Sequence, residues 1–408
     1  MTGEEARALD AADPLGFARQ RFGLPDGLIY LDGNSLGALP AATATKLAGT
    51  VERQWGEDLI ASWNRHGWID APSRVAGKLS PLLGAAAHEL LIADSTSVCL
   101  FKLLAAAVQA RPGRPVILSE QGNFPTDLYV AQGLAQLVPE LRLVTVGAGE
   151  IAGAIDERTA VVMLTQVDYR SGARHDMAAV NAAARNAGAL TLWDLSHSAG
   201  ALALDLAGSG CDLAVGCGYK YLNGGPGAPA FLFVAERLQA ELRSPLSGWM
   251  GHAEPFAFEP SHRPAAGIGR FLTGTPSILA LAALEAGIAT FEGVTMDDLE
   301  AKSRRLSELF IAEVEARCGD QVRLASPRDP AARGSHVSFA HPEGYAVVQA
   351  LIARGIVGDF RAPDLMRFGF APLYNRHEEV WRAAEALGEV LASREWDQPR
   401  FLERARVT

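Results

Sequence analysis

Cysteine, net positive charge and long apolar runs are all scarce in this 408-residue sequence, and each shortage excludes a class of protein. Its four cysteines, Cys99, Cys211, Cys217 and Cys318, show no CxxC spacing, and no histidine pair has the spacing of a helical zinc site. We therefore expect no bound metal and no disulfide framework. The net charge of −10 disfavours nucleic acids and anionic membranes as partners.

Membrane and export signals are also missing from the sequence. No apolar run approaches the ~18 residues of a transmembrane helix. The acidic N-terminus lacks the apolar core of a signal peptide. We expect a cytoplasmic protein. The hydrophobic fraction of 49% and the charged fraction of 21% are typical of globular proteins, and the length suggests two or three domains.

The middle of the chain alternates strand-like and helical patterns. Short apolar runs at 115–118, 141–146, 160–164 and 189–193 predict strands, and the alanine-rich segment 177–187 predicts a helix. Such alternation predicts an α/β fold with a mostly parallel sheet covered on both faces. Ligands of such sheets bind at the carboxyl ends of the strands.

The C-terminal part has a different rhythm. We predict strands at 336–339, 356–360 and 365–370, a helix at 345–354, and a last helix with Val380, Ala384, Leu387 and Leu391 on one apolar face. The expected organisation is an N-terminal arm (1–50), a large α/β domain (51–284) and a small α+β domain (285–408).

The strongest candidate site lies between residues 193 and 227. Asp194 directly follows a continuous apolar strand, His197 comes three residues later, and Lys220 stands between two tyrosines in a glycine-rich segment. A lysine in an apolar pocket has its charged form disfavoured, so its amine becomes a nucleophile. Pyridoxal phosphate needs such a lysine for a Schiff base and a carboxylate beside its pyridine nitrogen. The joint pattern therefore predicts a pyridoxal-phosphate site.

These motifs resemble the fold-type I pyridoxal-phosphate enzymes and, more narrowly, the kynureninase family. The likeness covers nearly the whole chain. The segments that carry it, besides the motif around Lys220, are YLDGNSLG at 30–37, NFPTD at 123–127, GWMGH at 248–252, Thr275-Pro276, and Arg367 followed by APLYN at 371–375. The resemblance implies a homodimer that shares its active site between subunits and hydrolyses L-kynurenine to anthranilate and L-alanine.

The resemblance also implies roles around the cofactor. Lys220 forms the internal aldimine, Asp194 pairs with the pyridinium nitrogen and His197 supports Asp194. Phe124 stacks on the cofactor ring, and Tyr219 is a candidate for proton transfer as well as for phosphate binding. The other implied cofactor residues are Thr96, Asp127, Thr165, and Trp249 and Thr275 from the neighbouring subunit.

The start of the helix over 98–108 is a natural phosphate site, because the hydroxyls of Ser95 and Thr96 lie beside free backbone N–H groups. An ordinary helix cap explains the same residues. Arg367, in an apolar strand, is expected to bind the substrate α-carboxylate, although it also fits a structural salt bridge, and Arg361 is a nearby rival.

The remaining expected substrate-binding residues are Asn34 and Ser35 of the arm, and Trp63 and Gly274 at the aryl group. With Thr275, the last two resemble bacterial members that favour kynurenine over its 3-hydroxy form; plain packing is the alternative for Trp63.

Two other functions stay open from the sequence. A cysteine desulfurase on this fold needs a nucleophilic cysteine in a mobile loop of the C-terminal half. Only Cys318 lies there, and its segment looks like a helix end, where the dipole disfavours a thiolate. A catalytically inactive ligand-binding regulator is the second alternative, although the lysine, the acid and the arginine are all present. The G-x-G-x-x-A match at 147–152 leaves too few residues for a dinucleotide-binding helix, so we expect a turn there.

Overall fold

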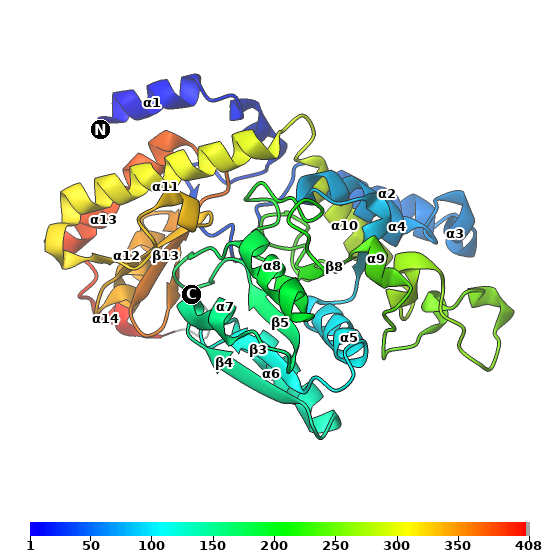
Figure 1. Cartoon of the computed structure of the whole chain (residues 1–408). Coiled ribbons are helices and arrows are strands. Elements are labelled where there is room, and N and C mark those ends of the chain that lie inside the picture. The colour runs from blue at the N-terminus through cyan, green and yellow to red at the C-terminus, as the bar shows by residue number, and fades with distance from the viewer. Residues whose placement is uncertain (405–408) are drawn as a thin grey trace.

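The computed structural model describes residues 1–404, and a seven-stranded sheet forms the centre of its larger part (Figure 1). β8 runs antiparallel to both of its neighbours, and the other strands run parallel to one another. In spatial order the strands are β2 (Leu90–Ala93), β8 (Ala230–Val234), β7 (Leu213–Gly216), β6 (Leu190–Asp194), β5 (Thr159–Thr165), β3 (Val116–Glu120) and β4 (Arg142–Val146).

Helices cover both faces of this sheet because its parallel strands are joined by crossovers. The crossovers from β2 to β3 and from β3 to β4 advance across the sheet, whereas those from β4 to β5 and from β5 to β6 return. Right-handed crossovers therefore place α5 (Thr96–Gln109) and α6 (Pro125–Leu137) on one face, and α7 (Ile151–Ala154) and α8 (Met177–Ala187) on the other. All residues of β5 to β8 are buried, as expected for a doubly covered sheet.

A second, antiparallel sheet forms in the C-terminal part. Its order is β12 (Asp359–Arg361), β13 (Leu365–Gly369), β10 (His336–Ala340) and β9 (Arg323–Leu324). The long helices α11 (Met296–Cys318) and α13 (His377–Ser393) pack together beside it, and α12 (Gly344–Ala353) contacts β13 (Figure 1). Phe310, Phe339 and Phe368 belong to the apolar core of this part, which is separate from the core around the large sheet.

The predicted α/β fold with a mostly parallel sheet is confirmed. The helix predicted at 177–187 coincides with α8, and the predicted strands and C-terminal helices are all present. The prediction of one strand over 356–360 was wrong, because this segment forms two strands. β11 (Ile356–Val357) pairs with β1 (Ile29–Tyr30), and β12 pairs with β13. They part at Gly358, where a Cβ atom would lie 2.8 Å from the Phe368 ring.

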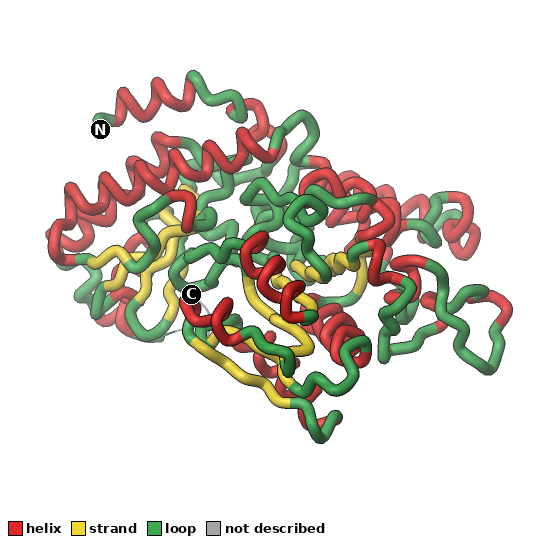
Figure 2. The backbone as a smooth tube through the Cα atoms, in the orientation of Figure 1, coloured by secondary structure: helices red, strands yellow, loops and turns green. Residues whose placement is uncertain are grey.

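The other helices flank these two sheets. α1 (Gly3–Ala11) packs on α13, and the segment between α9 and α10 extends from the body of the molecule (Figure 1). Figure 2 shows that this segment is mostly loop. None of the helices within residues 1–404 combines the length and apolar content needed to cross a membrane. The remaining helices are α2 (Thr43–Gly49), α3 (Ser62–Arg65), α4 (Ala71–Leu79), α9 (Glu236–Gln239), α10 (Ile278–Ala289) and α14 (Pro399–Leu402).

The arm that follows β1 lies between the two sheets. The Gly37 backbone N–H donates to the Tyr219 carbonyl oxygen at 2.8 Å. A Cβ atom at residue 37 would lie 2.3 Å from the Lys220 carbonyl oxygen, so only glycine allows this approach. On the other side, the Gly369 backbone N–H donates to the Leu31 carbonyl oxygen at 2.7 Å. The arm therefore connects the segment around Lys220 to the C-terminal sheet.

Candidate active site

The candidate site forms where three neighbouring parallel strands end. β5 ends at Thr165, β6 ends at Asp194, and Lys220 follows β7 by four residues. Parallel strands present their carboxyl ends at one edge of a sheet, so these three side chains are brought to the same edge. The start of α5, with Ser95 and Thr96, follows β2 at that edge too. The sheet topology thus gathers residues that are 125 positions apart in the chain, from 95 to 220.

Lys220 faces a histidine and two aromatic rings. Its Nζ lies 2.9 Å from His197 Nε2, 5.8 Å from the centroid of the Phe124 ring and 6.0 Å from that of the Tyr219 ring. Burial, and secondly the charge of Lys220, hold the pKa of His197 well below its usual value. The imidazole is therefore neutral and accepts a hydrogen bond from the lysine. His197 Nδ1 is buried without a partner.

Two buried carboxyl groups lie beside this lysine. Asp194 Oδ1 accepts a hydrogen bond from the Ser196 backbone N–H at 2.7 Å, and Asp127 Oδ2 accepts one from Thr165 Oγ1 at 3.2 Å. Neither acid has an ion-pair partner among the described residues. Burial raises the pKa of Asp194, and burial and the charge of Asp194 raise that of Asp127. A cation placed beside them would lower both pKa values by favouring the ionised carboxylates, so the pair suits a protonated ring nitrogen.

The loop before α6 fixes the position of Phe124. Asn123 Oδ1 accepts hydrogen bonds from the backbone N–H groups of Phe124 at 2.8 Å and of Thr165 at 3.2 Å. Phe124 has φ −57° and ψ 128°, the extended geometry expected before a proline. Asn123 is a positioning residue that sequence reasoning did not single out, because its bonds depend on β5 lying next to β3.

The start of α5 is anchored from behind by a buried lysine. Lys102 pairs with Asp94 and donates to the Phe271 carbonyl oxygen at 2.8 Å. Ser95 Oγ caps the helix by accepting from the Val98 N–H at 3.4 Å, while Thr96 is half-buried. A cavity of about 220 Å³ next to this helix start is lined by Asp94 and by residues 272–277, which include Gly274 and Thr275.

Arg367 lies in a charged cluster on β12 and β13. Its side chain is 2% exposed, and its Nε donates to Asp359 Oδ1 at 2.8 Å while Nη2 pairs with Oδ2. Asp359 and Arg367 are direct cross-strand partners. Arg361 Nη2 also donates to Asp359 Oδ2, at 2.6 Å. The structural salt bridge expected as the alternative for Arg367 is therefore present.

The arm closes this cluster from the other side. Ser35 Oγ donates to Asp359 Oδ2 at 2.9 Å and accepts from Arg367 Nη2 at 3.0 Å. With its amide oxygen turned toward the arginine, buried Asn34 accepts from Arg367 Nε at 2.9 Å. Burial, and secondly the charge of Asp359, raise the pKa of Asp32 to about 7. The arm thus contributes two polar side chains and a carboxyl group to the arginine cluster.

The lysine and the arginine cluster are joined through one aromatic pair. The rings of Phe124 and Tyr169 pack edge to face with centroids 5.2 Å apart. The Tyr169 carbonyl oxygen accepts a hydrogen bond from Arg367 Nη1. Phe124 in turn lies under Lys220. One continuous wall therefore carries the Lys220 amine at one end and guanidinium groups at the other, an arrangement that suits an amino acid with its carboxylate on the arginines.

Comparison with known proteins agrees with this arrangement. The family model "Kynureninase C-terminal domain" matches residues 299–387. The chain is 52% identical to the kynureninase of Burkholderia mallei (strain SAVP1) over 415 residues, covering 100% of both. The chain belongs to the kynureninase family. The resemblance predicted from the sequence is confirmed.

Solved structures show that the fold of this kynureninase-family chain is shared more widely. A cysteine desulfurase from Thermococcus onnurineus NA1 superposes with a TM-score of 0.79 at 19% identity, covering 93% of this chain and 98% of that one. A C-DES variant with glycine covalently linked to its PLP cofactor gives the same TM-score and identity over 90% of this chain and 98% of that one. At this identity the likeness concerns the fold alone.

The structure offers no thiol suited to the desulfurase alternative. All four cysteines of the chain are buried. Cys318 ends α11, as expected, and burial raises the pKa of its thiol to about 11. A reactive cysteine needs the opposite, an accessible thiol with a lowered pKa.

Three residues implied by the family resemblance lie apart from Lys220 within one chain. Trp63 packs edge to face on Trp68 at 6.0 Å, and Trp249 packs on Phe256 at 5.7 Å. Trp249 is 38% exposed, and Thr275 is exposed. Among residues 1–404, no hydrogen bond, ion pair or ring contact joins Trp63, Trp249 or Thr275 to Lys220.

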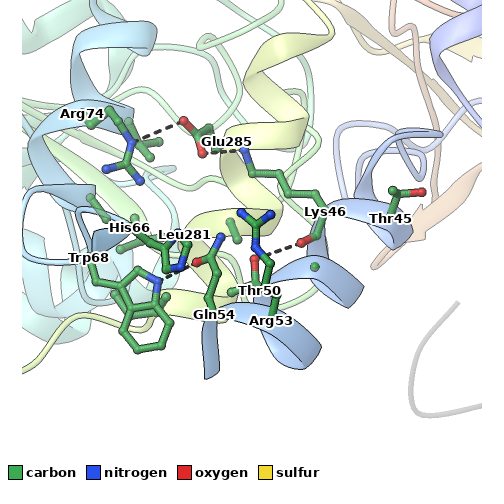
Figure 3. Close-up of a pocket in the computed structure, with 15 residues that line it drawn as sticks. Thr45, Lys46, Thr50, Arg53, Gln54, His66, Trp68, Arg74, Leu281 and Glu285 are labelled. Carbon is green, nitrogen blue, oxygen red and sulfur yellow. Dashed lines mark hydrogen bonds and ion pairs between the residues drawn. The ribbon is translucent and has the colours of Figure 1, made fainter. Parts of the chain in front are cut away.

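A larger cavity, of about 410 Å³, lies between α2, α4 and α10 and includes none of these site residues (Figure 3). Glu285 accepts hydrogen bonds there from Lys46 Nζ at 2.5 Å and from Lys78 Nζ at 2.7 Å. Burial would raise the pKa of Glu285, but the two lysines lower it to about 2. Trp68 Nε1 donates to Gln54 Oε1 at 2.7 Å. We interpret this cluster as an ionic connection between three helices.

Proposed function

We propose that this protein is a pyridoxal-phosphate-dependent hydrolase that cleaves L-kynurenine to anthranilate and L-alanine. The observation that carries the proposal is the wall from Lys220 to Arg367, set beside the buried Asp194, in a chain that matches a kynureninase along its full length. A lysine, a buried acid and a carboxylate-binding arginine are the groups that a pyridoxal-phosphate enzyme needs to act on an amino acid.

The residues at the sheet edge fit the cofactor. We propose that Lys220 holds it covalently, that Asp194 faces its ring nitrogen with Asp127 and Thr165 close by, and that Phe124 lies against its ring. Bound pyridoxal phosphate supplies an electron sink for the bonds at the substrate α-carbon. The hydroxyls of Ser95, Thr96 and Tyr219 are the proposed phosphate ligands within the chain, and the free N–H groups at the start of α5 favour an anion there.

The reaction needs protons to move at defined atoms. With the cofactor bound, the Lys220 amine would be the base that removes the substrate α-proton. Water adds to the γ-carbonyl, and the Cβ–Cγ bond then breaks, so that anthranilate leaves and the alanine part takes up a proton. We propose Tyr219 for proton transfer in these later steps. Neutral His197, 2.9 Å from Lys220 Nζ, orients the free lysine through its Nε2.

Substrate binding is proposed to involve both parts of the chain. Arg367 binds the α-carboxylate at the arginine cluster, and the arm residues Asn34 and Ser35, which contact Arg367, complete that end of the pocket. Trp63 and Gly274 line the aryl end, with a preference for kynurenine over 3-hydroxykynurenine. We further propose that residues 51–284 carry the cofactor and that residues 285–408 supply the arginines.

We also propose a homodimer that works in the cytoplasm. Within residues 1–404, no hydrogen bond, ion pair or ring contact joins Trp63, Trp249 or Thr275 to Lys220, so a second subunit is the expected source of these groups. Support comes from exposed apolar side chains near them: Trp55 is 57% exposed, Ile60 80% and Phe258 75%. Large apolar side chains that gather on a surface are typical of a protein interface. Sedimentation at micromolar concentration tests it, and a monomer with full activity would reject a shared site.

The proposed reaction is tested by mixing the cofactor-loaded protein with L-kynurenine and following anthranilate fluorescence. Wild type is expected to form anthranilate, and Lys220→Ala to form none. Lys102→Ala is not a suitable control, because Lys102 anchors the start of α5; Lys46→Ala, in the separate ionic cluster, is the matched lysine variant and should keep its turnover. Unchanged turnover in Lys220→Ala would reject the proposal.

A further inference from the structure

Most N–H groups of Arg367 are already bound to the protein. A guanidinium has five N–H donors. Arg367 Nε donates to Asp359, and its Nη2 donates both to Asp359 and to Ser35. Its Nη1 donates to the Tyr169 carbonyl oxygen. One N–H of Arg367 is left for a ligand, on a side chain that is only 2% exposed.

Most N–H groups of Arg361, in contrast, are not bound to any described residue of the protein. Its Nη2 donates to Asp359 Oδ2 at 2.6 Å and lies 3.4 Å from Ser35 Oγ. Its Nε is buried without a hydrogen-bond partner, and within residues 1–404 its Nη1 makes no hydrogen bond. The side chain is 36% exposed, so a ligand can reach it. Among the described residues, three N–H groups of Arg361 therefore have no protein partner, the buried one of Nε and the two of Nη1, against one N–H group of Arg367.

Both arginines belong to one cluster, which the Tyr169 and Phe124 pair joins to Lys220. Asp359 and Arg361 are two residues apart on β12, so their side chains share one face of the sheet, and Arg367 is the cross-strand partner of Asp359. The positive charges of Arg367 and Arg361 both contribute to the lowered pKa of His197, the residue that contacts Lys220. The charges of both arginines thus act at His197, the neighbour of Lys220.

We propose that Arg361 is a carboxylate-binding residue of the active site, which receives the substrate α-carboxylate together with the one free N–H of Arg367. The inference rests on the proposed function, and it makes Asp359 a positioning residue that holds both guanidinium groups. A buried anion between two arginines offsets their mutual repulsion and keeps both in place before the substrate arrives. Charge-assisted hydrogen bonds from two guanidinium groups then fix the amino-acid end of the substrate.

The test compares Arg361→Met and Arg361→Lys with Arg354→Met, in which a distant arginine paired with Glu389 and Glu395 is changed. Arg361→Met should raise KM for L-kynurenine about 10- to 100-fold, the cost of losing hydrogen bonds to a charged group. Its kcat should change little, since the carboxylate does not react. Arg361→Lys should recover part of the loss, and Arg354→Met should match wild type.

A second readout separates carboxylate binding from structural damage. The absorbance change of the bound cofactor is titrated with L-kynurenine and with its amine analogue, in which hydrogen replaces the α-carboxylate. Wild type should bind the amino acid more tightly, and Arg361→Met should reduce this preference at least about 10-fold while unfolding at the same temperature as wild type. A KM within twofold of wild type, or a preserved preference for the amino acid, would overturn the proposal.

The same titration keeps this inference distinct from the proposed function. If wild type fails to cleave L-kynurenine, the absorbance change is measured instead with L-alanine and ethylamine. Loss of the preference for L-alanine in Arg361→Met then supports the role of Arg361 while the kynurenine-cleaving function is rejected. A preference that is unchanged by the substitution overturns the role of Arg361 whatever the substrate is.

Discussion

Asp32 is predicted to make the protein less stable as the pH rises from 5 to 8. Its carboxyl group lies near Asp359, which takes both Arg361 and Arg367 as ion-pair partners and leaves Asp32 with none among the described residues. Burial and the charge of Asp359 raise the pKa of Asp32 from 3.8 to about 7. The folded state therefore keeps a proton that the unfolded state releases, and unfolding is favoured as the pH increases through this window.

The size of the effect follows from the two pKa values. One unit corresponds to about 1.4 kcal/mol, so the raised pKa of Asp32 costs roughly 1.6 kcal/mol of folding free energy at pH 5 and up to about 4 kcal/mol at pH 8, where the buried carboxyl group is ionised. Asp32→Asn carries no charge at either pH. We therefore compare the free energy of unfolding of Asp32→Asn with that of wild type. The variant's value minus the wild-type value should increase by up to about 3 kcal/mol from pH 5 to pH 8.

Urea unfolding of both proteins, followed by tryptophan fluorescence at pH 5, 6.5 and 8, measures this difference. Contributions from all other titrating groups cancel in the comparison. Asp26→Asn changes an exposed acid of the same arm and should run parallel to wild type at every pH. A difference between Asp32→Asn and wild type that stays constant within about 0.5 kcal/mol would refute the reasoning, because it would mean that Asp32 is ionised in the folded state throughout.

Three other predictions concern single contacts. Asp194→Asn should lower the cleavage rate at least about 100-fold. It should also stabilise the cofactor-free protein, because it removes a buried carboxylate that has no ion-pair partner among the described residues. A lower unfolding temperature of the variant would contradict this. Glu285→Gln should lower the free energy of unfolding by about 1–2 kcal/mol at pH 7. This difference from wild type should shrink as the pH falls from 4.5 toward 2, because Glu285 becomes protonated there. Urea unfolding of both proteins at pH 7 and pH 3 checks it. Gly37→Ala should reduce turnover at least about 10-fold without unfolding the protein, because its Cβ would push the arm off the Lys220 backbone; unchanged kinetics would show that the arm moves freely.

Local patterns in the sequence predicted four of the seven strands of the large sheet, β3, β4, β5 and β6, but not β2, β7 or β8. The run at 189–193 is apolar throughout because β6 is buried on both faces, and Asp194 marks its end. The helix at 177–187 is delimited by Asp176, which caps it, and by Gly188, which has a positive φ of 77°. These signals are all within one element, so they can be read without knowing what the element packs against.

The arginine cluster could not be predicted in the same way. Asp359 contacts Arg367 only because β12 and β13 pair in one particular register. The predicted single strand over 356–360 did not indicate where β12 begins or which residue of β13 it faces. The contacts of Asn34 and Ser35 with Arg367 join residues more than 300 positions apart, through an arm with little regular structure of its own. The roles of Lys220 and Asp194 were accessible from chemistry and order along the chain, whereas the division of work between Arg361 and Arg367 depends on a count of hydrogen bonds in three dimensions.

The central claim is that this site cleaves the Cβ–Cγ bond of kynurenine. The most direct test is to supply the cofactor-loaded protein with L-kynurenine or L-cysteine and to quantify L-alanine, anthranilate and released sulfide. We expect equimolar anthranilate and L-alanine from L-kynurenine, and no L-alanine from L-cysteine. L-alanine formed from L-cysteine with no anthranilate from L-kynurenine would contradict it and would favour the desulfurase reaction.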